Sequence, residues 1–191
     1  MMKDFQNLEE FEALSDHEIL DFEAIDTVLD QLGLKRLTGV WTSFIPLRKI
    51  RVKQWIGELR KLTGHPVSLQ LTREEITPYM HEDGVICFCK KDIYRVDKLF
   101  MLLAHETAHF VLMKDARYAL IKQVDAAYNS RPQQASSMHA PIERCANLIT
   151  LELLARCMLV EQNQKTLRSM QLCAESLRKQ LTNQPFCCRM D

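Results

Sequence analysis

The sequence predicts an α+β fold, with a small, mainly antiparallel sheet packed against two central helices and further helices at both ends. Three observations predict it. Apolar residues recur at helical spacing along most of the 191-residue chain. Two short strand-like segments lie near the middle. Two of the predicted helices are largely apolar, which indicates that they are buried at the centre of the fold.

The overall composition argues against several classes of protein. Apolar residues make up 47% and charged residues 26% of the chain, which is typical of a globular protein. The 25 basic and 25 acidic residues balance, so the charge does not predict direct binding to nucleic acid. No apolar run approaches the roughly 18 residues of a membrane span, and the acidic start is unlike a signal peptide. Seven scattered cysteines without a C-x-x-C pair predict reduced thiols and a cytoplasmic protein.

The first predicted helix runs from Ser15 to Gly33 in the segment SDHEILDFEAIDTVLDQLG. Ser15 and Glu18 have the spacing of a capping box, and Gly33 supplies a natural stop. The apolar residues of one face are Phe22, Ile25, Val28, Leu29 and Leu32. Residues 37–46 contain glycine and proline and are predicted to be a connection. We therefore assign residues 1–44 to an N-terminal helical extension.

A second helix and two strands follow. The helix is predicted from about Leu47 to Leu62 and ends before Gly64. Its buried stripe comprises Val52, Trp55, Ile56, Leu59 and Leu62. The segment PVSLQLT alternates apolar and polar residues, as in a half-buried strand. The apolar segment GVICFC, residues 84–89, predicts a second strand that ends at a KKD turn.

The second half of the chain predicts two apolar helices and one amphipathic helix. Asp97 can cap the first, DKLFMLLAHETAHFVLM, which is apolar almost all round. Residues 114–139 are less apolar, and part of this region is predicted to be an exposed loop. Pro141 suits the first turn of the second, PIERCANLITLELLARCMLV. The amphipathic helix is predicted from about Gln164 to Leu181.

The stretch AHETAHF places two histidines four residues apart on one helix. His105 and His109 therefore lie on the same face, where two imidazole nitrogens can reach one Zn²⁺ at about 2.0–2.1 Å. Glu106 is rotated away from the first ligand and can act as a general base, because zinc lowers the pKa of a coordinated water to about 7. Burying these polar residues unpaired would be costly, and a metal ion would explain all three at once.

Zinc in a catalytic site needs a third protein ligand and an open fourth position. The candidates are His139, Glu143, Glu152, Asp115 and Asp125. Glu143 is preferred because it opens an apolar helix that should pack against the helix of the two histidines. Asn147 lies one turn on from Glu143, on the same face, and could orient a ligand histidine. Glu152 points to roughly the opposite side, where a solvated or paired residue is expected.

The segments AHETAHFVL and IERCANLITLELL together resemble the ImmA/IrrE-type metallopeptidases, which are small gluzincin-like proteins. The resemblance implies that His105, His109 and Glu143 bind zinc and that Glu106 is the general base. Asn147 then completes the second motif of the family.

The resemblance covers about residues 45–160 and implies a zincin-like metallopeptidase domain there. Residues 161–191 would form a C-terminal helix and tail outside it. The segment GVICFC would border the cleft of this domain. Val85, Ile86 and Cys87 are therefore expected to form an edge strand that pairs with an extended peptide substrate.

The predicted activity is zinc-dependent hydrolysis of a peptide bond within a protein. The resemblance implies regulatory proteolysis of a transcriptional repressor or another DNA-binding regulator. The balanced charge and the lack of a long apolar run predict that this chain itself contacts neither nucleic acid nor membrane. Tyr118, Tyr128 and His139 lie between the two motifs and are hypothetical stabilisers of the transition state. The alternative function is a non-catalytic, zinc-containing module that binds a partner peptide in the cleft. A third interpretation is a helical packing domain with a chance motif.

Overall fold

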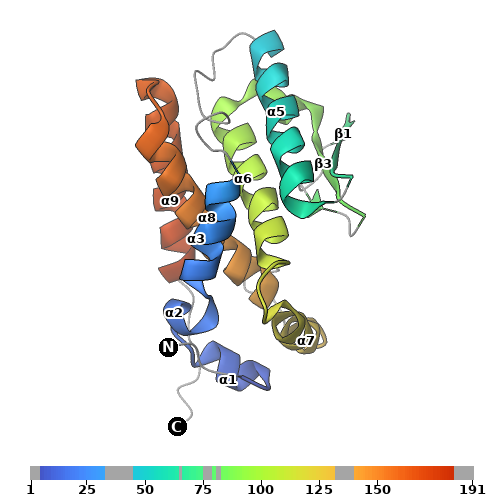
Figure 1. Cartoon of the computed structure of the whole chain (residues 1–191), viewed down its shortest axis with the longest axis vertical. Coiled ribbons are helices and arrows are strands. Elements are labelled where there is room, and N and C mark those ends of the chain that lie inside the picture. Colours follow the sequence, from blue (N-terminus) through green and yellow to red (C-terminus); the bar gives the residue numbers. More distant parts are fainter. Residues whose placement is uncertain are drawn as a thin grey trace.

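The computed structural model describes residues 5–32, 45–64, 66–74, 79–80, 83–131 and 140–182, and Figure 1 shows how its elements are arranged. In chain order the elements are α1 (Leu8–Glu12), α2 (Asp16–Ile19), α3 (Phe22–Gln31), α5 (Ile45–Thr63), β1 (Ser68–Thr72), β2 (Tyr79–Met80), β3 (Val85–Cys89), the 3-10 helix η1 (Lys90–Tyr94), α6 (Val96–Leu112), α7 (Tyr118–Asn129), α8 (Pro141–Val160) and α9 (Gln164–Thr182). The fold is α+β and mostly helical, as predicted.

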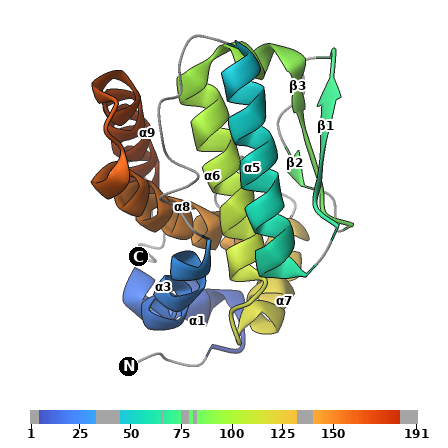
Figure 2. The same cartoon turned by 45° about the horizontal axis from the view of Figure 1, so that its top comes forward.

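The centre of the fold is the pair of apolar helices α6 and α8, which pack against each other. Leu103, Ala104 and Ala108 of α6 and Leu153 and Leu154 of α8 are inaccessible to solvent. Helix α9 packs on both of them, and α5 runs beside α6 in both views (Figures 1 and 2). The sheet lies on the other side of α5 from α9. The two helices that carry the histidine and glutamate motifs are therefore held rigidly within the core.

The sheet is mixed, and the expectation that it is mainly antiparallel is wrong for the described strands. Its order is β1-β3-β2, and the longer pairing, β1 with β3, is parallel from Ser68–Val85 to Thr72–Cys89. Only the two-residue strand β2 runs antiparallel to β3. Alternating polarity reveals that a segment is a strand but not its direction. A tight turn cannot join two parallel strands, and β2 lies between β1 and β3 in the chain and pairs with β3 on the side away from β1.

Two short helices, α2 and α3, lie in the segment from Ser15 for which the sequence predicts one continuous helix. The capping box is present, because the Glu18 carboxylate accepts hydrogen bonds from the backbone N–H and the hydroxyl of Ser15. The helix stops at Leu20, whose backbone is extended, and a new one begins where Asp21 accepts a hydrogen bond from Ala24 N–H at 3.1 Å. Helix α1 was not predicted, and the expected stop at Gly33 lies outside the described residues.

Two further elements differ from the sequence-based expectations. Helix α7 forms inside the region that was expected to be partly an exposed loop, with Ile121 and Val124 buried against its neighbours. Helix α6 begins at Val96 with Arg95 in the N-cap position, so Asp97 lies in the first turn and is not the cap. The predicted ranges of α5, α8 and α9 agree closely with the observed ones. Gly64 ends α5 with a positive φ of 69°, as expected of a C-terminal glycine.

The N-terminal helices belong to the same hydrophobic core as the rest of the chain. Phe11 and Leu29 share one cluster of buried side chains with Trp55 of α5 and Met170 of α9. The Arg144 guanidinium on α8 also donates to Asp16 Oδ1 at 3.0 Å, which joins this region to the start of α8. Within the described ranges, no helix combines the length and the apolar character needed to cross a bilayer.

Candidate metal centre

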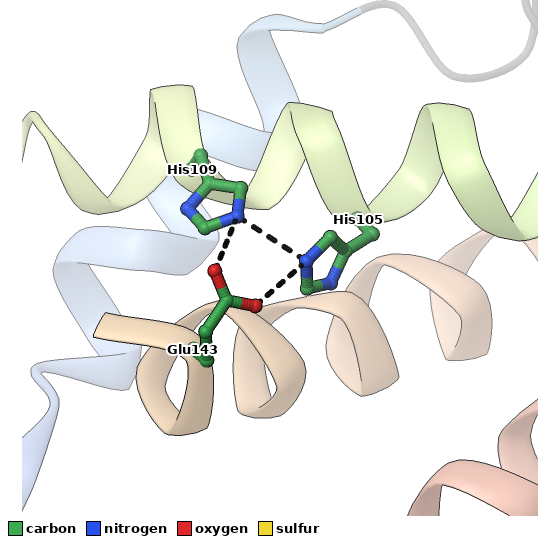
Figure 3. A group of neighbouring side chains, drawn as sticks. All are labelled: His105, His109 and Glu143. Atoms are coloured by element: carbon green, nitrogen blue, oxygen red, sulfur yellow. Dashed lines mark hydrogen bonds and ion pairs between the residues drawn. The ribbon is translucent and has the colours of Figure 1, made fainter. Parts of the chain in front are cut away.

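Helix α6 presents two histidines that point toward the same place (Figure 3). The Nε2 atoms of His105 and His109 lie 3.2 Å apart, and the two rings are nearly perpendicular, at 88°. One turn of helix separates the residues, so this approach follows directly from their spacing. Between them, the Thr107 hydroxyl accepts a hydrogen bond of 2.7 Å from the Trp55 indole, which fixes this turn of α6 against α5.

Glu143 completes the group from the first turn of α8. Its carboxylate oxygens lie 3.1 Å from His105 Nε2 and 3.5 Å from His109 Nε2. One potential ligand atom from each of the three residues lies within 4.8 Å of the others, so this group can hold a metal ion. Ligands at about 2.0–2.1 Å from a tetrahedral ion lie about 3.3 Å apart, which is close to all three observed separations. We refer to His105, His109 and Glu143 as the metal cluster.

The metal cluster is only partly buried. The exposed fractions of the side chains are 20% for His105, 13% for His109 and 32% for Glu143. A bound ion would therefore keep a side open toward solvent, as a catalytic site requires and a closed structural site does not.

Asp115, Glu152 and Asp125, which the sequence also offers as third ligands, are not among the described residues whose ligand atoms meet those of the two histidines. Asp115 Oδ1 accepts a hydrogen bond from Arg117 N–H at 2.8 Å. Glu152 accepts one from Arg156 on the outer side of α8. Asp125 contacts the backbone of α8, as described below, and His139 lies outside the described residues. Glu143 is thus the acid that α8 brings to the histidines.

In the metal-free cluster, electrostatic interactions favour a protonated His105 beside an ionised Glu143. Burial lowers the pKa of His105, but the hydrogen bond and charge of Glu143 outweigh it, so this pKa lies above its ordinary value. Burial and the charge of His105 lower the pKa of His109 to about 4. Burial raises the pKa of Glu143, but its interactions with the two imidazoles leave this pKa below its ordinary value. A metal ion would have to displace the proton on His105.

Glu106 lies next to the metal cluster and is almost fully buried, with 2% of its surface exposed. Burial raises its pKa to about 7, and its charge interacts with both His105 and Glu143. Its Oε2 atom has no hydrogen-bond partner within the part of the chain that the structure describes. A buried carboxylate oxygen without a donor is costly while it is charged, and this cost is the reason that burial raises the pKa of Glu106.

Asn147 lies one turn beyond Glu143 and is 3% exposed. Its side chain forms a hydrogen bond with His105, which contributes to the raised pKa of that imidazole. A hydrogen bond of this kind orients a metal-binding histidine and holds one tautomer.

The remaining residues considered from the sequence lie elsewhere. Val85, Ile86 and Cys87 belong to β3, the central strand of the sheet, so the expectation that they form an edge strand is wrong. Tyr118 and Tyr128 are half-buried on α7 and pack against the hydrophobic core.

One residue at the edge of the site has a role that was not predicted. Asp125 on α7 accepts a hydrogen bond of 2.9 Å from the N–H of Ile142, directly before Glu143. The sequence indicates this role of Asp125 only indirectly. Ala140, the N-cap residue of α8, has no side-chain acceptor for the first N–H groups of the helix. An acceptor from another element was therefore needed.

Comparison with models of protein families, with curated proteins and with solved structures finds no match to this chain.

Proposed function

We propose that the protein is a zinc-dependent endopeptidase. The observation that carries the proposal is the placement of the Glu106 carboxylate, with an unpartnered oxygen, beside a cluster of two imidazoles and one carboxylate. A metal site that served only to stabilise the fold would have no use for this additional acid.

Zinc suits this donor set better than magnesium or calcium does. Two imidazole nitrogens and one carboxylate oxygen are common zinc ligands, and magnesium and calcium prefer ligands that are all oxygen. The two Nε2 atoms lie 3.2 Å apart, and each has a different Glu143 oxygen within 3.5 Å, so a small adjustment of the carboxylate would suit a tetrahedral ion. The three ligands leave the fourth position for a water molecule or a substrate carbonyl.

Glu106 has the properties required of a group that first accepts and then donates a proton. When bound, zinc would polarise the scissile carbonyl and make water easier to deprotonate. The Glu106 carboxylate would accept the proton of the attacking water and then donate it to the leaving amine. In the metal-free protein burial raises the pKa of Glu106 to about 7, and a nearby cation would favour the ionised carboxylate that accepts the proton. Asn147 would keep the His105 ring in its ligand orientation.

The substrate class follows from the resemblance to ImmA/IrrE proteins, which also supports a zincin-like arrangement of residues 45–160. We infer that the substrate is a regulatory protein, such as a DNA-binding repressor, and that this chain does not itself contact nucleic acid. Since β3 is central, an extended substrate that pairs with the sheet would have to use β1 or β2.

The second candidate is a non-catalytic, zinc-containing module that binds a partner peptide. The burial of Glu106 favours it, because a general base must reach the water it deprotonates, and this side chain is only 2% exposed. In a peptidase, the attacking water molecule would have to reach the unpartnered Oε2 atom of Glu106.

The two functions are separated by Glu106→Gln, with Glu152→Gln as the matched control on the outer side of α8. Zinc content is measured by mass spectrometry, and new termini are counted in a complex peptide library. A peptidase predicts about one zinc per chain in all three proteins, and cleavage by the wild type and Glu152→Gln only. Zinc binding with no cleavage by any of them would favour the binding module. Absence of zinc from the wild type would contradict both functions.

A further inference from the structure

The third ligand, Glu143, lies in the first turn of α8, where helices commonly fray. Backbone N–H groups at the start of a helix have no partner within the helix, and a side chain at the N-cap normally accepts from one of them. The N-cap residue of α8 is Ala140, which cannot do so, and Pro141 has no N–H. The N–H of Ile142 is therefore the first group that needs an acceptor from outside α8.

Asp125 supplies that acceptor from α7. Its Oδ1 atom lies 2.9 Å from Ile142 N, and its Oδ2 atom accepts a hydrogen bond of 2.9 Å from the Asn129 side chain. Both carboxylate oxygens are thus held, and Asn129 lies one turn further along α7. The side chain of Asp125 is half-buried between α7 and α8, which pack against each other.

The position of Asp125 matters because Ile142 is adjacent to Glu143 in the chain. A shift of the first turn of α8 would move the Glu143 carboxylate, which is placed 3.1 Å from His105. Helix α6 provides two of the three ligands, and the third comes from α8, so the site depends on where the first turn of α8 lies. The contact between Asp125 and Ile142 joins the third ligand to α7.

We propose that Asp125 is a positioning residue for metal binding, which acts by capping α8 and holding Glu143 at the distance the ion requires. The inference depends on the proposed metal centre and extends it. Asp125 itself is not among the residues whose donor atoms meet in the metal cluster. Its contribution is geometric and comes from its hydrogen bond to Ile142.

Three substitutions separate this role from an effect of charge. Asp125→Ala removes both the acceptor and the charge. Asp125→Asn keeps an acceptor at the same reach, because asparagine caps helices as well as aspartate, and the Asn129 amide can rotate to accommodate it. Asp125→Glu keeps the charge and moves the acceptor by one methylene group. Asp21→Ala is the matched control, since Asp21 caps α3, which carries no residue of the site.

The readout is the dissociation constant for zinc, measured in competition with a chromophoric chelator, alongside the melting temperature of each metal-free protein. We expect Asp125→Ala to bind zinc at least tenfold more weakly, and Asp125→Asn to remain within about threefold of the wild type. Asp125→Glu should be weaker than Asp125→Asn. The control should lower the melting temperature and leave zinc affinity within about threefold.

The inference is overturned if Asp125→Ala binds zinc as the wild type does, or if the control weakens zinc binding equally. If Asp125→Ala does not fold, the contrast between asparagine and glutamate decides, because an effect of charge predicts that Asp125→Glu binds at least as tightly as Asp125→Asn. Failure of the wild type to bind zinc would overturn the metal centre and this inference together. Unchanged binding in the Asp125 variants would overturn the inference alone.

Discussion

His105 and Glu143 are 38 positions apart in the chain, yet His105 Nε2 lies 3.1 Å from a carboxylate oxygen of Glu143. The packing of α6 against α8 brings them together, and each changes the protonation of the other. The pKa of His105 is raised and that of Glu143 is lowered. In the metal-free protein the two residues therefore form an ion pair, which a bound metal ion would replace.

Zinc binding should release a countable number of protons at pH 6. His105 is largely protonated there, since its pKa lies above the ordinary value of about 6.5, and His109 is neutral because its pKa is about 4. Calorimetric titration of Glu106→Gln in buffers of different ionisation enthalpy should count about one proton per zinc. The wild type should release more, because Glu106, with a pKa of about 7, also loses its proton near the ion. Release of two protons by the variant would show that His109 is charged.

The burial of Glu106 should make the metal-free protein less stable at high pH. Its pKa is raised from 4.5 to about 7, so the folded state holds the proton more tightly than the unfolded state. The stability from this group is full below pH 4.5 and is lost as the pH rises toward 7. With chelator present, Glu106→Gln should therefore exceed the wild type by up to about 3 kcal/mol at pH 8 and by much less at pH 5. A difference in urea unfolding that does not change with pH would contradict the assigned burial of the charge.

Asn147→Ala should weaken zinc binding by roughly 10- to 100-fold, because the hydrogen bond that orients the His105 ring is lost. Thr150→Ala is the control. Thr150 is also buried on α8, but its hydroxyl donates to the carbonyl oxygen of Ala146 within the same helix. Both variants should unfold at lower denaturant concentrations, and only Asn147→Ala should change the dissociation constant. Equal zinc affinity in the two would remove Asn147 from the site.

The attachment of the N-terminal helices to α8 should depend on Arg144. Its guanidinium donates to Asp16 Oδ1 at 3.0 Å and stacks 5.9 Å from the centre of the Phe11 ring. Because this hydrogen bond involves a buried charge, Arg144→Met should lower the free energy of unfolding by about 1–3 kcal/mol. It should also increase amide hydrogen exchange in α1 and α2.

Arg131→Met provides the comparison, since Arg131 also pairs with the N-terminal region, at Glu12, but at 3.8 Å on the surface. Such an exposed pair contributes less than about 1 kcal/mol. If the two substitutions destabilise the protein equally, the contact of Arg144 with Asp16 holds the N-terminal helices no more firmly than an exposed ion pair does.

The helices of the site could be predicted because their signals are local. His105 and His109 lie within one helix, so their spacing determines their approach, and the apolar character of α6 and α8 predicts that the two helices pack together. The choice of Glu143 required that packing. The contact of Asp125 with Ile142 could not be predicted, because nothing in the sequence states which element lies over the start of α8.

The sheet and the smaller helices were harder to predict for different physical reasons. Strand direction depends on which neighbours the connections allow, and the alternating pattern of β1 is the same in either direction. The sequence from Ser15 onward predicts one helix, because its apolar period continues through Leu20 and Asp21, whereas the helical backbone is interrupted there. Helix α7 carries only Ile121 and Val124 as buried residues, which is too weak a stripe to distinguish it from a loop.

The central claim is that His105, His109 and Glu143 hold one zinc ion, and a crystal structure of the zinc-loaded protein with anomalous diffraction at the zinc edge tests it most directly. The account predicts one anomalous peak at about 2.0–2.2 Å from both imidazole Nε2 atoms and from a Glu143 oxygen. A peak at other side chains, or no peak at the metal cluster with zinc present in excess, would contradict it.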